Sequence, residues 1–334
     1  MNDAVLGTTA GVFRLRGQDL EPLGLDDQRI SAIYAWANPD ETATILAGSY
    51  ENGLFRSEDS GEQWTPISAG LTAPCIRTIV PDPLETGAIL CGTEPARIFR
   101  SGDGGVTWRE LDGIRAVPGV DDWYLPYSPR AGAVRNIYAP PGGSRMLASV
   151  EVGGLLDSHD RGATWTYVPV FADPDVHHIT GHPQDPNLLF ASLGWAGPRN
   201  QQRASDAPKL GGVARSRDGG RTWQKFHTDY TRATIVPPTR PDLVLAGPAK
   251  QVGEQGRIEA SVDGGDTWQP AGEGIEMPMS DMVELFMPAP DGSIWAIRSG
   301  GAPYRAQSGE WVWNPVLPAG ASVKVESVAW LPAL

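Results

Sequence analysis

Six ionisable residues recur at one position of short apolar segments, where they could together form a binding or catalytic site. They are Arg77, Arg135, His177, Arg232, Glu284 and Glu326. Two further acids, Glu94 and Glu151, follow neighbouring apolar segments, as does Glu51. An imidazole beside carboxylates can move protons, and guanidinium groups bind anions through paired hydrogen bonds. We therefore expect His177 to act as a general base or ligand, Glu94 or Glu151 as its acid partner, and the arginines as an anion clamp.

The same pattern has a structural alternative, a water-filled channel lined by a ring of ion pairs. The register of the segments could also differ by one residue, which would exchange Arg77 for Thr78 and His177 for His178. The counterpart of these residues in the second repeat falls near Ile33. If the acidic and basic side chains line a narrow cavity, their charges should shift one another's pKa values and favour a polar ligand.

Three of the five histidines lie close together in the sequence, at His177, His178 and His182. Adjacent residues of a strand point to opposite faces, so His177 and His178 are not expected to share one site. The sequence therefore predicts no three-histidine metal site, and no cofactor is expected. A metal held by His177 with Glu94 or Glu151 remains the alternative.

Two of the repeats carry insertions, at 113–132 and 194–211, which should rise on the same face over adjacent repeats. They contain the aromatic residues Trp123, Tyr124 and Trp195. Aromatic rings beside amide and guanidinium groups suit a sugar or a flat organic ligand. The alternative is that these side chains only anchor long loops to the repeats.

One motif, Ser-x-Asp-x-Gly-x-x-Trp, occurs five times, with its aspartates at Asp59, Asp103, Asp160, Asp218 and Asp263. Serine and aspartate oxygens can accept hydrogen bonds from turn amides, and glycine supplies a positive φ. The tryptophan begins the next strand and can pack between neighbouring units. Each motif offers one carboxylate, too few oxygens for a calcium site. We interpret the five aspartates as structural.

This motif resembles the Asp-box (BNR) repeat of sialidases, xyloglucanase-type glycosidases, sortilin-like receptors and photosystem II assembly factors. The resemblance covers nearly the whole chain and implies an all-β fold, a β-propeller formed by one domain over residues 1–334. Five boxed units, the unit at 283–316 and a composite first unit give seven blades. Residues 325–332 have the inner-strand pattern and should complete the first blade. Six blades is the alternative.

The enzymes of this superfamily match the sequence poorly. Sialidases carry an Arg-Ile-Pro motif near the amino terminus, which is absent here. Xyloglucanase-type enzymes have a catalytic Asp in an Asp-Val-Gly-Gly segment, and the similar segment here begins with Glu151. We expect a propeller that binds a small molecule. The more specific expectation is an enzyme of hydrolase or lyase type that acts on a polar or anionic substrate, saccharide-like or aromatic. The alternative is a non-catalytic scaffold with a protein partner on its rim.

Composition narrows the partners and the compartment. The formal net charge of −13 disfavours nucleic acid, and no stretch reads as a membrane span. The amino terminus lacks the basic and apolar parts of a signal peptide, so a cytoplasmic location is expected. Cys75 and Cys91 should lie nearly opposite each other on a hairpin, and we expect them to be thiols rather than a disulfide.

Overall fold

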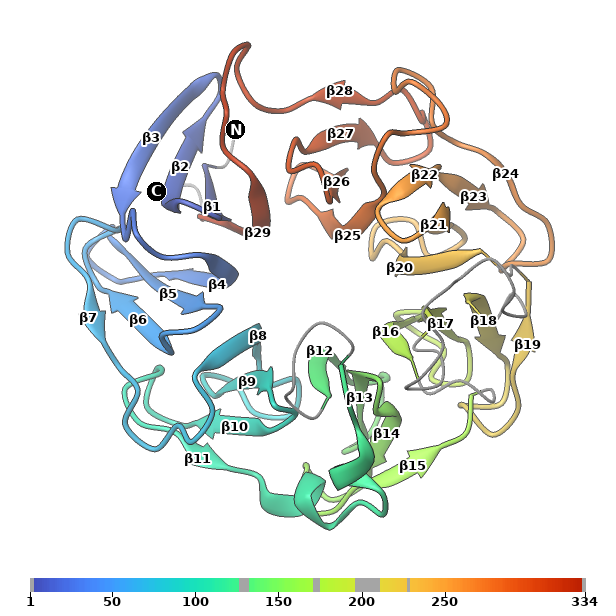
Figure 1. Cartoon of the computed structure of the whole chain (residues 1–334), viewed down its shortest axis with the longest axis horizontal. Helices are drawn as coiled ribbons and strands as arrows, with labels where there is room; N and C mark the ends of the chain where they lie inside the picture. The colour runs from blue at the N-terminus through green and yellow to red at the C-terminus, as the bar shows by residue number, and fades with distance from the viewer. Residues whose placement is uncertain (1–2, 126–131, 171–174, 196–210, 227–228, 332–334) are drawn as a thin grey trace.

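The chain forms a ring of antiparallel sheets around a central axis (Figure 1). The computed structural model describes residues 3–125, 132–170, 175–195, 211–226 and 229–331. Within these ranges the strands form seven sheets, each a blade of a β-propeller. Seven blades are therefore confirmed over the alternative of six.

Each blade runs from an inner strand at the axis to an outer strand at the rim (Figure 1). Blade one is β29 (Val325–Trp330), β1 (Ala4–Thr8), β2 (Gly11–Arg16) and β3 (Asp19–Gly24). Blade two is β4 (Ile30–Ala37), β5 (Ala43–Ser49), β6 (Leu54–Ser57) and β7 (Thr65–Pro66). Blade three is β8 (Cys75–Pro81), β9 (Ile89–Glu94), β10 (Ile98–Ser101) and β11 (Arg109–Glu110).

Blade four is β12 (Ala133–Tyr138), β13 (Met146–Glu151), β14 (Gly154–Ser158) and β15 (Thr166–Val168). Blade five is β16 (Val176–Gly181), β17 (Leu189–Leu193), β18 (Gly212–Ser216) and β19 (Gln224–Lys225). Blade six is β20 (Tyr230–Ile235), β21 (Val244–Gln251), β23 (Glu259–Ser261) and β24 (Gln269–Pro270), with β22 (Glu254–Gly256) paired to β21. Blade seven is β25 (Val283–Pro288), β26 (Ser293–Arg298), β27 (Tyr304–Gln307) and β28 (Asn314–Pro315).

The ring is closed by the carboxyl-terminal strand. Strand β29 pairs antiparallel with β1, with Val328 opposite Leu6 and Trp330 opposite Ala4. Blade one is therefore built from both ends of the chain, as the sequence predicts. Closure pairs the inner edge of the amino-terminal hairpin, which would otherwise be exposed.

The second strand of each blade is buried on both faces because neighbouring blades pack against it. Every residue of β5, β9, β13 and β17 is buried, which explains their uninterrupted apolar runs. A glycine in this strand permits close approach of the next blade. A Cβ at Gly92 would lie 2.7 Å from a methyl group of Val134, on the inner strand of blade four.

The Asp-box is a tightly hydrogen-bonded turn, shown here for blade three. The Ser101 Oγ accepts a hydrogen bond from the amide of Gly105 at 2.8 Å and donates one to Asp103 at 2.7 Å. Asp103 also accepts from the amide and hydroxyl of Thr107, and these hydrogen bonds lower the pKa of its carboxyl group to about 2. Gly105 has a φ of +88°. The turn uses its carboxylate internally, as a structural role requires.

The two cysteines do not face each other across the hairpin of blade three. Cys75 lies opposite Glu94, and Cys91 lies opposite Ile79. The prediction that the thiols lie nearly opposite is therefore wrong, because the pairing register separates them along the strands. Both cysteines are buried thiols that do not form a disulfide.

Candidate functional site

A β-bulge occurs in the inner strand of every blade and determines which side chain faces the axis. In blade three, Ile76 pairs with Thr93 and Thr78 with Gly92, so Arg77 is left unpaired. Each of the other inner strands also leaves one residue unpaired at its bulge, and in blade six Ala233 is unpaired as well. From blade two to blade seven and then blade one, these bulge residues are Ser31, Arg77, Arg135, His177, Arg232, Glu284 and Glu326. Bulges commonly redirect side chains near functional sites.

The bulge residue coincides with six of the positions expected to face the axis, and it differs from the expected position in blade two. In blade two the bulge residue is Ser31, whereas Ile33 pairs with Ala47 and is buried at 7% exposure. The prediction near Ile33 is therefore displaced by two residues, because an apolar strand pattern does not reveal where pairing is interrupted.

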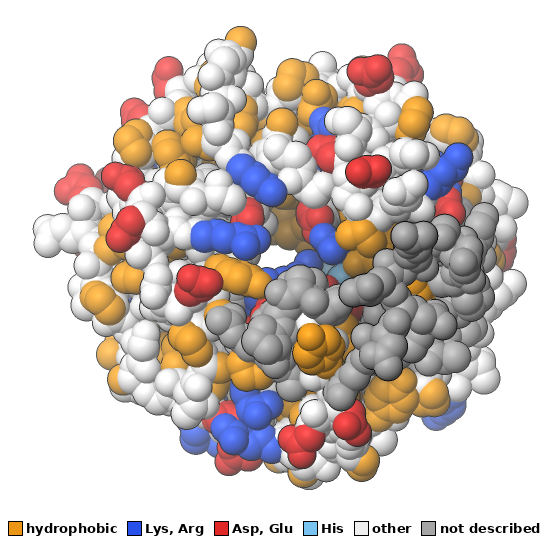
Figure 2. Space-filling view, viewed as in Figure 1, with side chains coloured by type: hydrophobic (Ala, Val, Ile, Leu, Met, Phe, Trp, Pro, Cys, Tyr) orange, Lys and Arg blue, Asp and Glu red, His pale blue; other side chains and the backbone are white. Residues whose placement is uncertain are grey.

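All seven bulge residues line one cavity of about 440 Å³ at the axis. Among the described residues its lining holds six cationic side chains and two acidic ones: Arg29, Arg77, Arg135, Arg232, Arg298 and Lys324, with Glu284 and Glu326. Figure 2 shows Lys and Arg side chains gathered around the central opening, with acidic side chains beside them. Among the described lining residues, cationic side chains thus outnumber acidic ones, in a chain of net charge −13.

A second cavity of about 450 Å³ continues along the inner strands and shares six lining residues with the first. The shared residues are Ser31, Arg77, Arg135, His178, Leu285 and Glu326. These side chains lie where the two cavities meet, so a ligand in the first cavity could contact the charged residues among them.

Ion pairs connect the bulge residues of neighbouring blades. The Nη1 of Arg232 lies 2.7 and 2.9 Å from the two carboxylate oxygens of Glu284. Arg135 contacts the same carboxylate at only 3.9 Å, and Glu151 at 3.3 Å. Arg232 is therefore firmly paired, whereas the contacts of Arg135 in the described part of the chain are long.

Glu94 and Glu151, the predicted acid partners, lie behind the arginines. They end β9 and β13 and are 0% and 3% exposed. Arg77 lies 3.5 Å from Glu94 and 3.9 Å from Glu151. Neither glutamate is among the described residues that line the cavity. Their carboxylates compensate part of the charge of Arg77 and Arg135 from below.

His177 lies in a buried polar cluster at the edge of the cavity. Its Nε2 is 3.2 Å from Oδ2 of Asp175 and 2.8 Å from the hydroxyl of Tyr230. Burial by itself lowers the pKa of His177, but the charges of Asp175 and Glu151 outweigh it and leave the pKa above its usual value. The Nε of Arg232 donates to the Tyr230 hydroxyl at 3.3 Å. This arrangement can hold a proton on the imidazole.

His178 also lines the cavity, so the expectation that the two histidines point to opposite sides is wrong. The bulge at His177 interrupts the strict alternation of the strand. Burial lowers the pKa of His178 to about 4, so this ring is neutral at pH 7. His182 lies in the turn after β16, where its Nδ1 accepts hydrogen bonds from the amides of Gln184 and Asp185.

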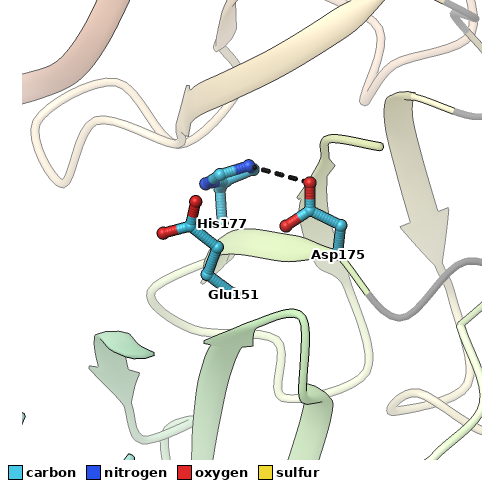
Figure 3. A group of neighbouring side chains, drawn as sticks. All are labelled: Glu151, Asp175 and His177. Atoms are coloured by element: carbon cyan, nitrogen blue, oxygen red, sulfur yellow. Dashed lines mark hydrogen bonds and ion pairs between the residues drawn. The ribbon is translucent and has the colours of Figure 1, made fainter. Parts of the chain in front are cut away.

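One group of described residues has a geometry that could hold a cation, formed by Glu151, Asp175 and His177 (Figure 3). Their ligand atoms lie within 4.8 Å of one another, and all three are buried. A metal there would compete with existing partners, because Arg77 and Arg135 contact Glu151 and His177 contacts Asp175. Sequence reasoning named His177 and Glu151 for this alternative but not Asp175.

Four site residues that sequence reasoning missed occupy one position, two residues before the bulge: Arg29, Asp175, Tyr230 and Lys324. Arg29 pairs with Glu326 at 2.9 Å, while Asp175 and Tyr230 contact His177. The repeat alignment that located the bulge residues also contains this position. The residue type at this position differs from blade to blade, and in blade three it is Cys75. The sequence pattern therefore does not mark the position as part of a site.

The aromatic residues of the insertions do not line the cavity in the described part of the chain. Trp123 is buried in an apolar cluster with Ile114 and Val150, which fits the loop-anchoring alternative. Tyr124 is exposed, and Trp195 is half-buried. Residues 126–131 and 196–210 lie outside the described residues.

The fold is similar to solved propellers of different function. The GH74 xyloglucanase from Xanthomonas campestris matches with a TM-score of 0.66 at 18% identity, over 98% of this chain and 52% of that one. YCF48 bound to a D1 peptide matches with a TM-score of 0.59 at 17% identity, over 92% of this chain and 90% of that one. An ancestral GH74 enzyme matches with a TM-score of 0.60 at 14% identity, over 99% of this chain and 40% of that one.

The chain therefore spans about half the length of the xyloglucanase that it resembles. Neither a protein-family model nor a curated protein sequence matches it. Among the helices of the described residues, none has the length and apolar character needed to cross a membrane. At these identities the likeness establishes the seven-bladed propeller and leaves both catalytic and scaffold functions open.

Proposed function

We propose that the axial cavity binds a small polar ligand that carries at least one negative charge. The observation that carries this proposal is the excess of cationic side chains on the wall of a 440 Å³ cavity in an acidic protein. A cationic funnel with weakly hydrated guanidinium groups favours carboxylate, phosphate or sulfate groups. A saccharide acid or a small aromatic acid fits this description.

Arg135 is the residue best placed to contact such a ligand. It lines the cavity, its side chain is 20% exposed, and its ion pairs of 3.3 and 3.9 Å are longer than strong charge-assisted hydrogen bonds. A bound anion can therefore gain hydrogen bonds from Arg135 without breaking a short existing pair. Arg232 already binds Glu284 at 2.7 Å, so its guanidinium group is less available to a ligand than that of Arg135.

Chemistry at this site would centre on His177, as a hydrolase or lyase type of reaction requires a group that transfers a proton. Asp175 orients the imidazole and favours its protonated form, and Glu151 adds to this effect. Glu94 has a supporting role in this proposal, since it lies beneath Arg77. The proton on His177 can be donated to a ligand held by Arg135.

The second candidate is a non-catalytic scaffold that binds a peptide or protein. The observation that favours it is the match with YCF48, which aligns over nearly the full length of both chains and was solved with a D1 peptide. In this case the axial charges would help orient a partner on the same face, and no small anion would need to bind.

Calorimetric titration of the full chain with inorganic phosphate, glucuronate and neutral glucose separates the two candidates. We expect one anion site per chain, and we expect Arg135→Gln to weaken it by about tenfold or more, the effect of losing a charge-assisted hydrogen bond. Arg240→Gln is the matched control, because Arg240 pairs with Asp242 outside the cavity. Binding of no anion, or equal loss in both variants, would reject the proposal.

A proton-linked readout tests the role of His177. An anion bound beside the imidazole should raise the pKa of His177 further, and this shift can be followed by NMR during phosphate titration. An unchanged His177 titration in the presence of saturating anion would contradict its place in the site.

A further inference from the structure

A tryptophan packs into six of the seven junctions between blades in the described structure. Each precedes the outer strand of its blade and lies in an apolar cluster shared with the preceding blade: Trp64, Trp108, Trp165, Trp223, Trp268 and Trp313. The indole of Trp64, for example, donates to the carbonyl of Leu23 in blade one at 2.7 Å. Trp313 keeps this role although the box of blade seven has decayed, donating to the carbonyl of Ala271 at 2.7 Å.

The junction between blades seven and one has a leucine at this position. Strand pairing places Pro22 opposite Phe13 in blade one and Pro66 opposite Phe55 in blade two. The residue two before each proline is the equivalent position. It is Trp64 in blade two and Leu20 in blade one.

A cavity of about 300 Å³ lies at this junction. Its apolar wall includes Leu15, Trp295, Val316 and Trp330, and Leu20 packs against the same cluster. The rings of Trp295 and Trp330 meet edge to face with centroids 4.7 Å apart. An apolar cavity of about 150 Å³ is large enough to bind benzene, so this one has room for a two-ring aromatic.

Two opposite charges, Asp291 and Arg305, lie at the edge of the cavity. Asp291 accepts hydrogen bonds from the amide and hydroxyl of Ser293 through Oδ1, which holds the carboxylate in place. Its Oδ2 lies 3.9 Å from Nη1 of Arg305, and both side chains are more than one third exposed. This long, accessible pair can separate to contact a polar substituent on a ligand.

We propose that this junction cavity is a second binding site, for a small planar aromatic molecule of indole size that carries a polar substituent. The aromatic ring takes the place of the tryptophan that the other junctions contain, and Arg305 or Asp291 contacts the substituent. The site is independent of the axial cavity, since the described linings of the two have no residue in common.

Titration of the full chain with indole, followed by ligand-observed NMR, tests this site. We expect saturable binding at one site, and we expect Leu20→Trp to weaken it by about tenfold or more because the new ring fills the cavity. Thr65→Trp is the matched control, since it adds an exposed indole to the outer strand of blade two. Indole affinity in this control should equal that of the wild-type protein.

Ala289→Leu reduces the cavity from its other wall and decides the question if Leu20→Trp does not fold. In the Arg135→Gln background, where the axial anion site is weakened, indole-3-acetate should bind more tightly than indole, and adding Arg305→Gln should remove this advantage. Arg135→Gln should leave indole binding unchanged, which separates this site from the axial one. The proposal is overturned if indole shows no saturable binding, or if both cavity-filling variants bind it like the wild-type protein.

Discussion

Arg232 and Glu284 are bulge residues of adjacent blades, and one guanidinium nitrogen of Arg232 contacts both carboxylate oxygens of Glu284, at 2.7 and 2.9 Å. Arg135 lies farther from the same carboxylate, with its Nη2 at 3.9 Å from Oε2. The axial charges therefore make contacts of two kinds. The short pair joins blades six and seven, and the longer contacts would leave the guanidinium of Arg135 available to the proposed ligand.

Removing the short pair should destabilise the protein. Arg232→Ala leaves Glu284 without its close partner, and we expect a loss of about 2–3 kcal/mol in the free energy of unfolding. Loss of one partner from a fully buried pair costs about 3–5 kcal/mol, and Glu284 keeps partial solvent access and Arg135. Chemical denaturation of the variant and the wild-type protein measures the difference.

Arg135→Ala is the comparison, and it should cost less than Arg232→Ala because its contacts are longer and the buried Glu151 keeps Arg77. An equal loss of stability in the two variants would show that the ring is a uniform structural network, as the channel alternative in the sequence analysis supposes.

Truncation after Ala321 should prevent closure of the ring. The shortened chain lacks β29, so β1 loses its inner partner and Leu6 and Val5 lose the cover that this strand provides. We expect aggregation or a large drop in melting temperature, because exposed strand edges associate with one another. Differential scanning calorimetry with size-exclusion chromatography measures both effects. A truncated chain that remains monomeric and melts like the full-length protein contradicts closure by β29.

The Asp-box serine should be essential for stability and irrelevant to binding. Ser101→Ala removes a buried acceptor from the amide of Gly105, and the loss of this hydrogen bond should cost about 1–3 kcal/mol. Phosphate affinity per folded molecule should be unchanged, since the box lies away from the axial cavity. A variant with normal melting but without phosphate binding would give the box a functional role.

The sequence predicts the fold well because the repeat carries its own physical reasons. Gly105 requires a positive φ, Trp108 fills a junction, and the strand pattern of residues 325–330 requires a partner. These structural requirements recur from blade to blade, so the number of repeats in the sequence predicts the number of blades. Comparison of the repeats also shows that Leu20 occupies the position at which the other blades have a tryptophan.

The site is predicted less completely because bulges and single contacts leave little trace in the sequence. Nothing in the apolar pattern shows that pairing skips Ser31, or that His177 and His178 face one cavity. Asp175 lies only two residues before His177, but its role depends on a side-chain contact of 3.2 Å that no repeat pattern encodes.

Proton binding by the two adjacent histidines should affect stability in opposite directions. The pKa of His177 is raised in the folded protein, so its stabilising effect is complete below the ordinary value of about 6.5 and is lost as pH rises through the folded pKa. The pKa of His178 is lowered to about 4, so its contribution is present above about pH 6.5 and is lost as pH falls toward 4.

Melting temperatures measured from pH 4 to pH 9 for His177→Gln and His178→Gln test this opposition. We expect His177→Gln to remove part of the decline in melting temperature above about pH 6.5. In this variant Asp175 and Glu151 no longer face an imidazole whose charge is lost as the pH rises. His178→Gln should instead reduce the decline between about pH 6.5 and pH 4, because no buried ring then has to accept a proton. NMR titration of the imidazoles in the wild-type protein assigns the two groups directly. A folded-state pKa of His177 below that of His178 would contradict the arrangement of charges around both rings.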